Sequence, residues 1–125
     1  MDFIARAALA AGLVAFAAAA VSAQDAAKVD PRHYKVVVEN PQVRVLRIHY
    51  GPHESSVMHA HPDSVVTYLS DGRMKFLLPG GKTITSSGKA GQSVWTPAGR
   101  HNPTNLSARP FDAVIVELKG PHAAK

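Results

Sequence analysis

The chain of 125 residues contains no cysteine, and this absence excludes several classes of site. A disulfide scaffold, a thiolate zinc site, a thiol nucleophile and a lipid anchor on cysteine all require that residue. Charged residues make up only 18% of the chain and aromatic residues 6%, which excludes a highly charged, disordered chain. Because 46% of the residues are apolar and the length suits one domain, the composition predicts a single globular core.

Lys and Arg outnumber Asp and Glu by 14 to 9, which gives the chain a net charge of +5. These basic residues are scattered singly and form no run that could follow a phosphate backbone. We therefore expect no binding to nucleic acid. The positive charge is expected to aid solubility or to attract small acidic ligands.

Residues 1–23 have the three parts of a secretory signal peptide. A short polar start with Arg6 precedes the apolar run 7–21, and small residues lead up to Ala23. This pattern predicts cleavage after Ala23, a periplasmic or extracellular protein, and no stable membrane insertion after cleavage. An uncleaved membrane anchor is the alternative, because a run of about 15 apolar residues is only slightly shorter than a membrane span.

Beyond the signal peptide we expect a flexible N-terminal leader (24–33), a β domain (34–119) and a C-terminal tail (120–125). The β domain contains β-branched and aromatic runs separated by Gly and Pro, with no helical periodicity. The expected strands are 34–39, 43–50, 65–69, 74–78, 82–85, 93–96 and 111–118. Short strands at such regular spacing predict an all-β fold, either a sandwich or a small barrel.

Two further features of the sequence indicate how the strands are arranged. Residues 70–73 contain an Asp-Gly pair, which is typical of a tight hairpin of primed type between strands 65–69 and 74–78. The stretch 111–118 is apolar on both faces, which predicts a central strand.

The chemistry of the chain centres on three histidines. His59 and His61 lie two positions apart, so on extended chain both side chains point to the same face and can reach one metal ion. His101, in the turn-rich stretch 97–102, offers a third imidazole. Solvent-exposed loop histidines are the alternative interpretation. Three neutral imidazoles suit a divalent ion of Fe, Zn, Mn, Ni or Cu, and the sequence does not choose among these metals.

Around these histidines the chain resembles the cupin family. Residues 51–72 resemble the first cupin motif, with Gly, His-x-His and a closing Gly. Residues 91–105 resemble the second motif, with Gly, Pro-x-Gly, His and Asn, although one residue is missing before His101. The chain is thus similar to a small secreted single-domain cupin of type 2. This resemblance implies a jelly-roll type of β-barrel, the double-stranded β-helix, whose histidines face the barrel mouth and hold a divalent metal.

One departure from the family pattern affects the expected chemistry. The glutamate ligand of the first motif would fall at Val65 or Val66, where no carboxylate is present. A site of three neutral histidines would leave the metal its full charge and open positions, which favours anionic or bidentate oxygen or sulfur ligands. Three-histidine iron centres in this family belong to dioxygenases of thiols or diketones, so the resemblance implies that chemistry.

Three carboxylates have alternative roles. Asp63 has the same strand parity as His59 and His61 and is either a fourth ligand or an ordinary turn residue. Glu54 is expected to cap a loop, with ligation as the alternative. Glu117 interrupts an apolar strand, so it either hydrogen-bonds to a metal-binding histidine or forms a salt bridge at the strand end.

The remaining histidines and aromatic residues have less specific roles. His49 and His53 either act as acid or base at the barrel mouth or are simply solvated. His33 and His122 lie near the ends of the mature chain and are expected to have no role. Three aromatic residues are expected in the core or the pocket wall: Tyr68, Phe76 and Trp95.

Three functions are compatible with this pattern. The first is a metal-dependent, oxygenase-like enzyme that acts on a small, anionic molecule. The second is a binding or sensing module that holds a metal or a small ligand without turnover. The third is a barrel whose histidines never meet. Because cupin barrels commonly pair through edge strands, the resemblance also implies a homodimer through residues 28–39.

Overall fold

The computed structural model describes residues 24–120, which contain one short helix and nine strands in two sheets. The signal peptide expected in residues 1–23, and nearly all of the expected C-terminal tail, lie outside the described residues. The elements are α2 (Ala26–Val29), β1 (Tyr34–Glu39), β2 (Val43–Tyr50), β3 (His59–His61), β4 (Ser64–Tyr68), β5 (Gly72–Leu77), β6 (Thr83–Gly88), β7 (Ser93–Thr96), β8 (Gly99–Asn105) and β9 (Phe111–Leu118).

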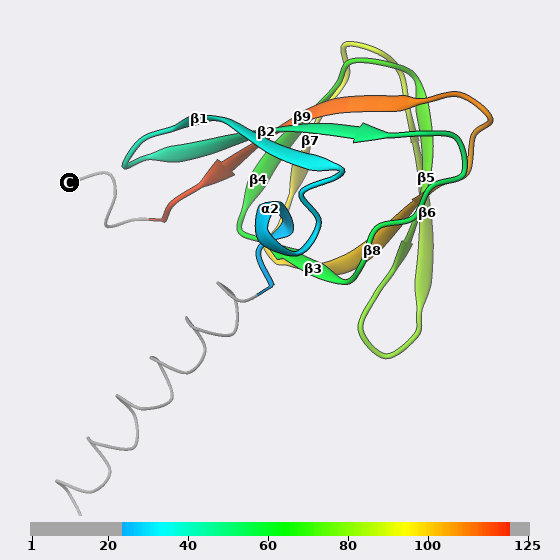
Figure 1. The fold of residues 1–125 in the computed structure, drawn as a ribbon, viewed down its shortest axis with the longest axis horizontal. Helices are drawn as coiled ribbons and strands as arrows, with labels where there is room; N and C mark the ends of the chain where they lie inside the picture. Colours follow the sequence, from blue (N-terminus) through cyan, green and yellow to red (C-terminus); the bar gives the residue numbers. More distant parts are fainter. Residues whose placement is uncertain (1–23, 121–125) are drawn as a thin grey trace, which may run out of the picture.

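The strands form two antiparallel sheets that enclose the core (Figure 1). One sheet has the order β1-β2-β9-β4-β7 and the other has the order β3-β8-β5-β6. Apart from β1 with β2 and β5 with β6, neighbouring strands in each sheet are not consecutive in sequence, as in a jelly roll. The expected all-β fold is therefore confirmed.

The core lies between the sheets and follows from the alternation of side chains along each strand. On β9, Phe111, Ala113 and Ile115 are buried, and the residues between them are only partly buried. Leu46 and Tyr50 on β2 are completely buried against this row. Each fully buried large apolar side chain contributes about 1.5–3 kcal/mol. The central position expected for the last strand is also confirmed, because β9 pairs with both β2 and β4.

The hairpin predicted at residues 70–73 is wrong. Strand β4 pairs with β7 and β9, whereas β5 pairs with β6 and β8, so residues 69–71 carry the chain from one sheet to the other. The glycine of the Asp-Gly pair, Gly72, is required for packing instead. A Cβ atom on Gly72 would lie 2.3 Å from Cδ1 of the buried Phe111 ring, so close packing excludes a side chain there.

Strands β3 and β8 carry the three histidines; extended chain was expected at His59 and His61, whereas β8 was expected only as a turn-rich stretch. Pro97, Gly99 and Pro103 are typical of turns, so the sequence did not predict a strand where β8 forms. It forms because β3 pairs along it, with His59 opposite His101 and the next residues in register.

The flexible leader predicted for residues 24–33 is wrong as well. Asp25 caps α2, with its side chain accepting a hydrogen bond from the Ala27 amide at 3.3 Å. Ala26, Asp30 and His33 are buried against the barrel. Residues 24–33, which we call the N-terminal segment, are therefore an ordered part of the β domain. Within residues 24–120, no helix has the length and apolar character needed to cross a membrane.

Strand β1 forms an edge of the larger sheet and pairs only with β2. Val36, Val37 and Val38 are 44%, 57% and 53% exposed on this edge. The expected edge strand is confirmed for residues 34–39, whereas residues 28–33 of the predicted dimer contact lie in α2 and the turn after it. Dimerisation itself remains a prediction.

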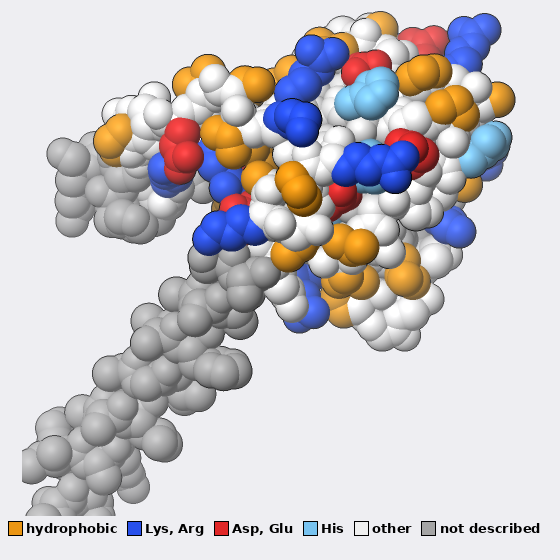
Figure 2. All heavy atoms as spheres, viewed as in Figure 1, with side chains coloured by type: hydrophobic (Ala, Val, Ile, Leu, Met, Phe, Trp, Pro, Cys, Tyr) orange, Lys and Arg blue, Asp and Glu red, His pale blue; other side chains and the backbone are white. Residues whose placement is uncertain are grey.

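Acidic and basic side chains lie close together at several places on the face shown in Figure 2. Among the described residues, Lys119 pairs with Glu39 at 2.7 Å and Arg47 pairs with Asp112 at 3.2 Å. This mixing leaves no continuous basic stripe on that face. The expected lack of nucleic-acid binding stays a prediction.

Candidate metal centre

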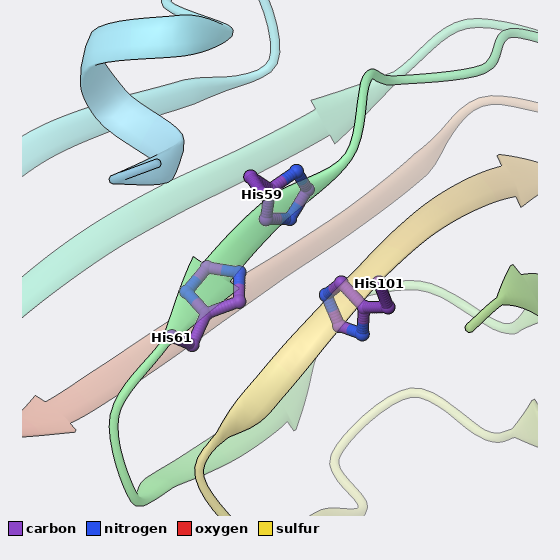
Figure 3. Close-up of side chains that lie close together, drawn as sticks. All are labelled: His59, His61 and His101. Atoms are coloured by element: carbon purple, nitrogen blue, oxygen red, sulfur yellow. The ribbon is translucent and has the colours of Figure 1, made fainter. Parts of the chain in front are cut away.

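The three histidines predicted as ligands converge between β3 and β8 (Figure 3). The ring centre of His59 lies 4.8 Å from that of His61 and 4.9 Å from that of His101. The ring centres of His61 and His101 are 5.4 Å apart. One nitrogen from each ring can be chosen so that all three lie within 4.8 Å of one another. The alternative of loop histidines that never meet is therefore excluded.

Hydrogen bonds determine which nitrogen of two of these rings faces the centre. Nδ1 of His59 donates to the carbonyl oxygen of Val57 at 2.8 Å. Nδ1 of His61 donates to Oε2 of Glu117 at 2.6 Å. Each Nδ1 thus carries the proton and each Nε2 carries the lone pair, which is the tautomer that a metal requires.

Two buried nitrogens in this cluster have no hydrogen-bond partner among the described residues: Nε2 of His59 and Nε2 of His101. Buried polar atoms are almost always paired, because leaving one unpaired costs about 1–3 kcal/mol. A metal ion bound by these nitrogens would satisfy both. The residues present therefore fit a divalent metal.

Burial also keeps two of the imidazoles neutral. Loss of hydration, reinforced by His61, lowers the pKa of His59 from 6.5 to about 4. Loss of hydration, together with the nearby His59 and His61, lowers the pKa of His101 to about 3. Both rings are therefore uncharged at neutral pH and have lone pairs to offer a metal.

Glu117 fulfils both of the alternative roles expected for it. Its Oε2 receives the hydrogen bond from His61, and its Oε1 receives one from Nε of Arg44 at 2.9 Å. It therefore orients a histidine and forms a salt bridge at once. On β4, Val66 lines the adjacent cavity, so an apolar side chain occupies the region where the family pattern has a carboxylate.

The other two candidate carboxylates have the loop roles expected for them. Asp63 accepts a hydrogen bond from the Ala98 amide at 2.8 Å and connects two turns. Glu54 accepts from the Gly51 amide at 2.7 Å and pairs with Arg32. Neither belongs to the histidine cluster found among residues 24–120.

His49 and His53 are not part of the cluster, and His122 lies outside the described residues. His49 is exposed, with Nδ1 2.8 Å from Asp112, and His53 is exposed with a positive φ of 59°. Both therefore match the solvated interpretation.

The expectation that His33 has no structural role is wrong. It is buried, stacks on Tyr50 with ring centres 4.3 Å apart, and hydrogen-bonds to Asp30 at 2.7 Å and to Glu54 at 3.1 Å. Its position near the end of the mature chain gave no signal of this, because Glu54 is 21 residues away.

A cavity of about 300 Å³ adjoins His61 and His101 inside the barrel. Phe76 stacks on His101 with ring centres 5.0 Å apart and forms part of the wall. The three aromatic residues expected in the core or pocket wall all line this cavity: Tyr68, Phe76 and Trp95. Among the described residues that line it, none is Lys, Arg, Asp or Glu, so the wall is almost entirely apolar.

Comparisons with known proteins identify the same architecture. A cupin domain from Bordetella pertussis Tohama I has 30% identity to this chain, covers 70% of it and 92% of its own length, and superposes with a TM-score of 0.65. A conserved protein with a double-stranded β-helix domain from Klebsiella pneumoniae has 28% identity, with coverage of 70% and 76% and a TM-score of 0.56.

A cupin family protein from Methanocaldococcus jannaschii has 17% identity, with coverage of 73% and 81% and a TM-score of 0.55, and supports the fold alone. No protein-family profile and no curated protein sequence matches the chain. The topology, the paired histidine strands and the 30% identity to the Bordetella domain lead to one conclusion. The chain belongs to the cupin family.

Proposed function

We propose that the protein binds one divalent transition metal through His59, His61 and His101 and uses it to bind a small molecule in the adjacent cavity. The observation that carries this proposal is the pair of buried, unpaired Nε2 atoms of His59 and His101. A metal bound there supplies a Lewis acid with open coordination positions, because three histidines leave room for further ligands.

The cavity supports an uncharged, mainly apolar ligand rather than a strongly acidic one. Its described lining contains no Lys or Arg that could neutralise a ligand carboxylate or phosphate. The hydroxyls of Tyr34 and Tyr50, both in the lining, hydrogen-bond to each other at 2.6 Å. Burial raises the pKa of both phenols, so neither supplies a charge. The ligand that fits has an apolar body and an oxygen or sulfur donor directed at the metal.

We further propose oxygenase-like chemistry at this centre, with a non-catalytic binding module as the alternative. The described lining contains no carboxylate or amine for acid–base work, and its two histidines, His61 and His101, are proposed metal ligands. An oxygenase needs a redox metal and an open position, whereas a binding module needs only the pocket. The metal and its accessibility therefore distinguish the two functions.

The experiment uses nitric oxide as a probe of the open position. Metal-free protein is loaded with Fe(II) without air, and nitric oxide is then added. Oxygenase-like chemistry predicts one iron per chain and the electron paramagnetic resonance signal of a ferrous nitrosyl. Iron binding without that signal would favour the binding module. Failure to bind Fe(II), Zn(II) or Co(II) would refute the metal site.

We also propose export of the protein and its pairing as a homodimer. The segment 1–23 supports export to the periplasm or beyond. The exposed valine edge of β1 supports a homodimer.

A further inference from the structure

The N-terminal segment lies directly against the strand that carries two of the three histidines. Strand β3 has only three residues and pairs with β8 along one edge. Along its other edge, the Ala60 amide donates to the carbonyl oxygen of Gln24 at 2.8 Å, and Asp25 forms a parallel bridge with Ala60. The peptide between His59 and His61 is therefore held by the N-terminal segment, with α2 beside it (Figure 1).

One chain of hydrogen bonds leads from this segment to His61. Both carboxylate oxygens of Asp25 accept from Arg44, with Nη1 at 2.6 Å from Oδ2. Nε of Arg44 donates to Oε1 of Glu117, and Oε2 of Glu117 accepts a hydrogen bond from Nδ1 of His61 at 2.6 Å. All of these side chains are at least four-fifths buried, since the most exposed, Arg44, is 17% accessible. The chain of bonds is thus shielded from water.

The charges along this chain explain why Asp25 affects the metal centre. Arg44 lies between the carboxylates of Asp25 and Glu117. Without Asp25, the positive guanidinium would offset the negative charge of Glu117 and weaken its attraction to a metal-bound His61. The hydrogen bond from Arg44 holds the pKa of Asp25 below its usual value, so Asp25 stays ionised. Asp25, Arg44 and Glu117 together carry one negative charge behind His61, which favours a cation on the far side of the ring.

A second chain leads to His59. Ser56 donates its hydroxyl proton to Asp30, and its oxygen lies 3.2 Å from Nδ1 of His59. Burial would raise the pKa of Asp30, but hydrogen bonds from Ser56 and His33 outweigh it and lower that pKa. Because the Ser56 hydroxyl donates its hydrogen bond to Asp30, its oxygen can only accept a hydrogen bond from Nδ1 of His59. Together with the carbonyl oxygen of Val57, this contact keeps the proton on Nδ1 and the lone pair on Nε2.

We propose that Asp25 and Asp30 are positioning residues for the metal centre, acting on His61 through Arg44 and Glu117 and on His59 through Ser56. Each fixes the orientation of a histidine and the nitrogen that it presents. The inference rests on the proposed function, because it concerns how well the same three histidines bind a metal. Loss of the groups that support ligating histidines lowers metal affinity by about 10- to 100-fold.

The test is a titration of the metal-free full chain with Co(II), which reports affinity and, through its visible absorption, ligand geometry. Asp25→Asn keeps the helix cap, since Asn caps as well as Asp, but removes the charge that neutralises Arg44. We expect the affinity of Asp25→Asn to fall about 10-fold and its cobalt spectrum to change. Asp112→Asn is the matched control, because it also removes an aspartate that pairs with an arginine of β2, here Arg47, but on the exposed side. It should leave affinity and spectrum unchanged.

Double variants separate positioning from a general loss of stability. If Asp25 acts through Glu117, the variant Asp25→Asn with Glu117→Gln should bind Co(II) no more weakly than Glu117→Gln alone. Asp30→Asn acts through a different histidine, so its effect should multiply with that of Glu117→Gln. Wild-type affinity and spectrum in both Asp25→Asn and Asp30→Asn would overturn the proposal. Multiplying effects of Asp25→Asn and Glu117→Gln would overturn the route through Glu117. A wild-type chain that binds no Co(II) would instead refute the metal site itself.

Discussion

At the scale of single residues, buried neutral histidines make the stability of the metal-free protein depend on pH. The folded-state pKa is about 4 for His59 and about 3 for His101, against 6.5 for an unperturbed histidine. Between these values the unfolded chain binds more protons than the folded chain, so unfolding becomes easier as pH falls. The full stability contribution is thus present above about pH 6.5 and is lost progressively below it.

We therefore expect metal-free protein to lose on the order of a few kcal/mol of unfolding free energy between about pH 7 and about pH 4. Urea unfolding across this range measures the loss. The variant His101→Asn lacks one of the two buried groups and should have a smaller pH dependence. An equal pH dependence in the two proteins would show that His101 is not desolvated as described.

The parity of His59 and His61 could be predicted from the sequence, because side chains two apart on a strand share a face. Both alternative roles of Glu117 were expected, but neither its partner His61 nor the position of His33 could be predicted in the same way. Glu117 lies 56 residues from His61, and only the pairing of β9 within its sheet brings it to that ring. Such contacts depend on tertiary register, which no local pattern encodes.

At the scale of elements, the sequence predicted most strands but not how they pair. The strands with β-branched runs predicted at 34–39 and 111–118 have the same bounds as β1 and β9. The hairpin prediction at 70–73 failed because an Asp-Gly pair reports a tight bend and not the partner of the next strand. Strand β3 is only three residues long and exists because β8 and the N-terminal segment bind its two edges.

The edge strand β1 carries the prediction about assembly. Its unpaired backbone edge and exposed valines can pair with a second copy of the same strand. We expect a homodimer at tens of micromolar by analytical ultracentrifugation, and a monomer for Val37→Lys, which puts a charge on this edge. Val57→Lys changes another exposed valine, 48% accessible, outside the named strands and should remain dimeric. A monomeric wild-type chain would contradict the predicted contact.

At the scale of the whole molecule, the expected cleavage site lies next to residues that support the metal centre. Cleavage after Ala23 would retain Gln24 and Asp25, which bind the Ala60 amide and Arg44. We therefore expect the exported protein to begin at Gln24, as measured by intact mass on protein from its native host. A mature chain that begins after Asp25 would contradict this expectation and would remove the first chain of hydrogen bonds.

The metal centre is the feature on which the fold, the neutral imidazoles and the cavity all converge. If His59, His61 and His101 hold one ion together, any single change to alanine should reduce metal content strongly. His49→Ala is the matched control, because His49 is exposed and lies outside the cluster. Bound metal should also stabilise the fold by about 2.7 kcal/mol at a free concentration 100 times its dissociation constant.

The decisive measurement is the metal content per chain of wild-type, His59→Ala, His61→Ala, His101→Ala and His49→Ala, each reconstituted with Co(II) and analysed by elemental mass spectrometry. We expect one ion per chain in the wild type and in His49→Ala, and strongly reduced content in the three cluster variants. Full occupancy in His101→Ala together with loss in an added Asp63→Ala or Glu54→Ala variant would contradict the three-histidine site, because a carboxylate would then be a ligand in its place.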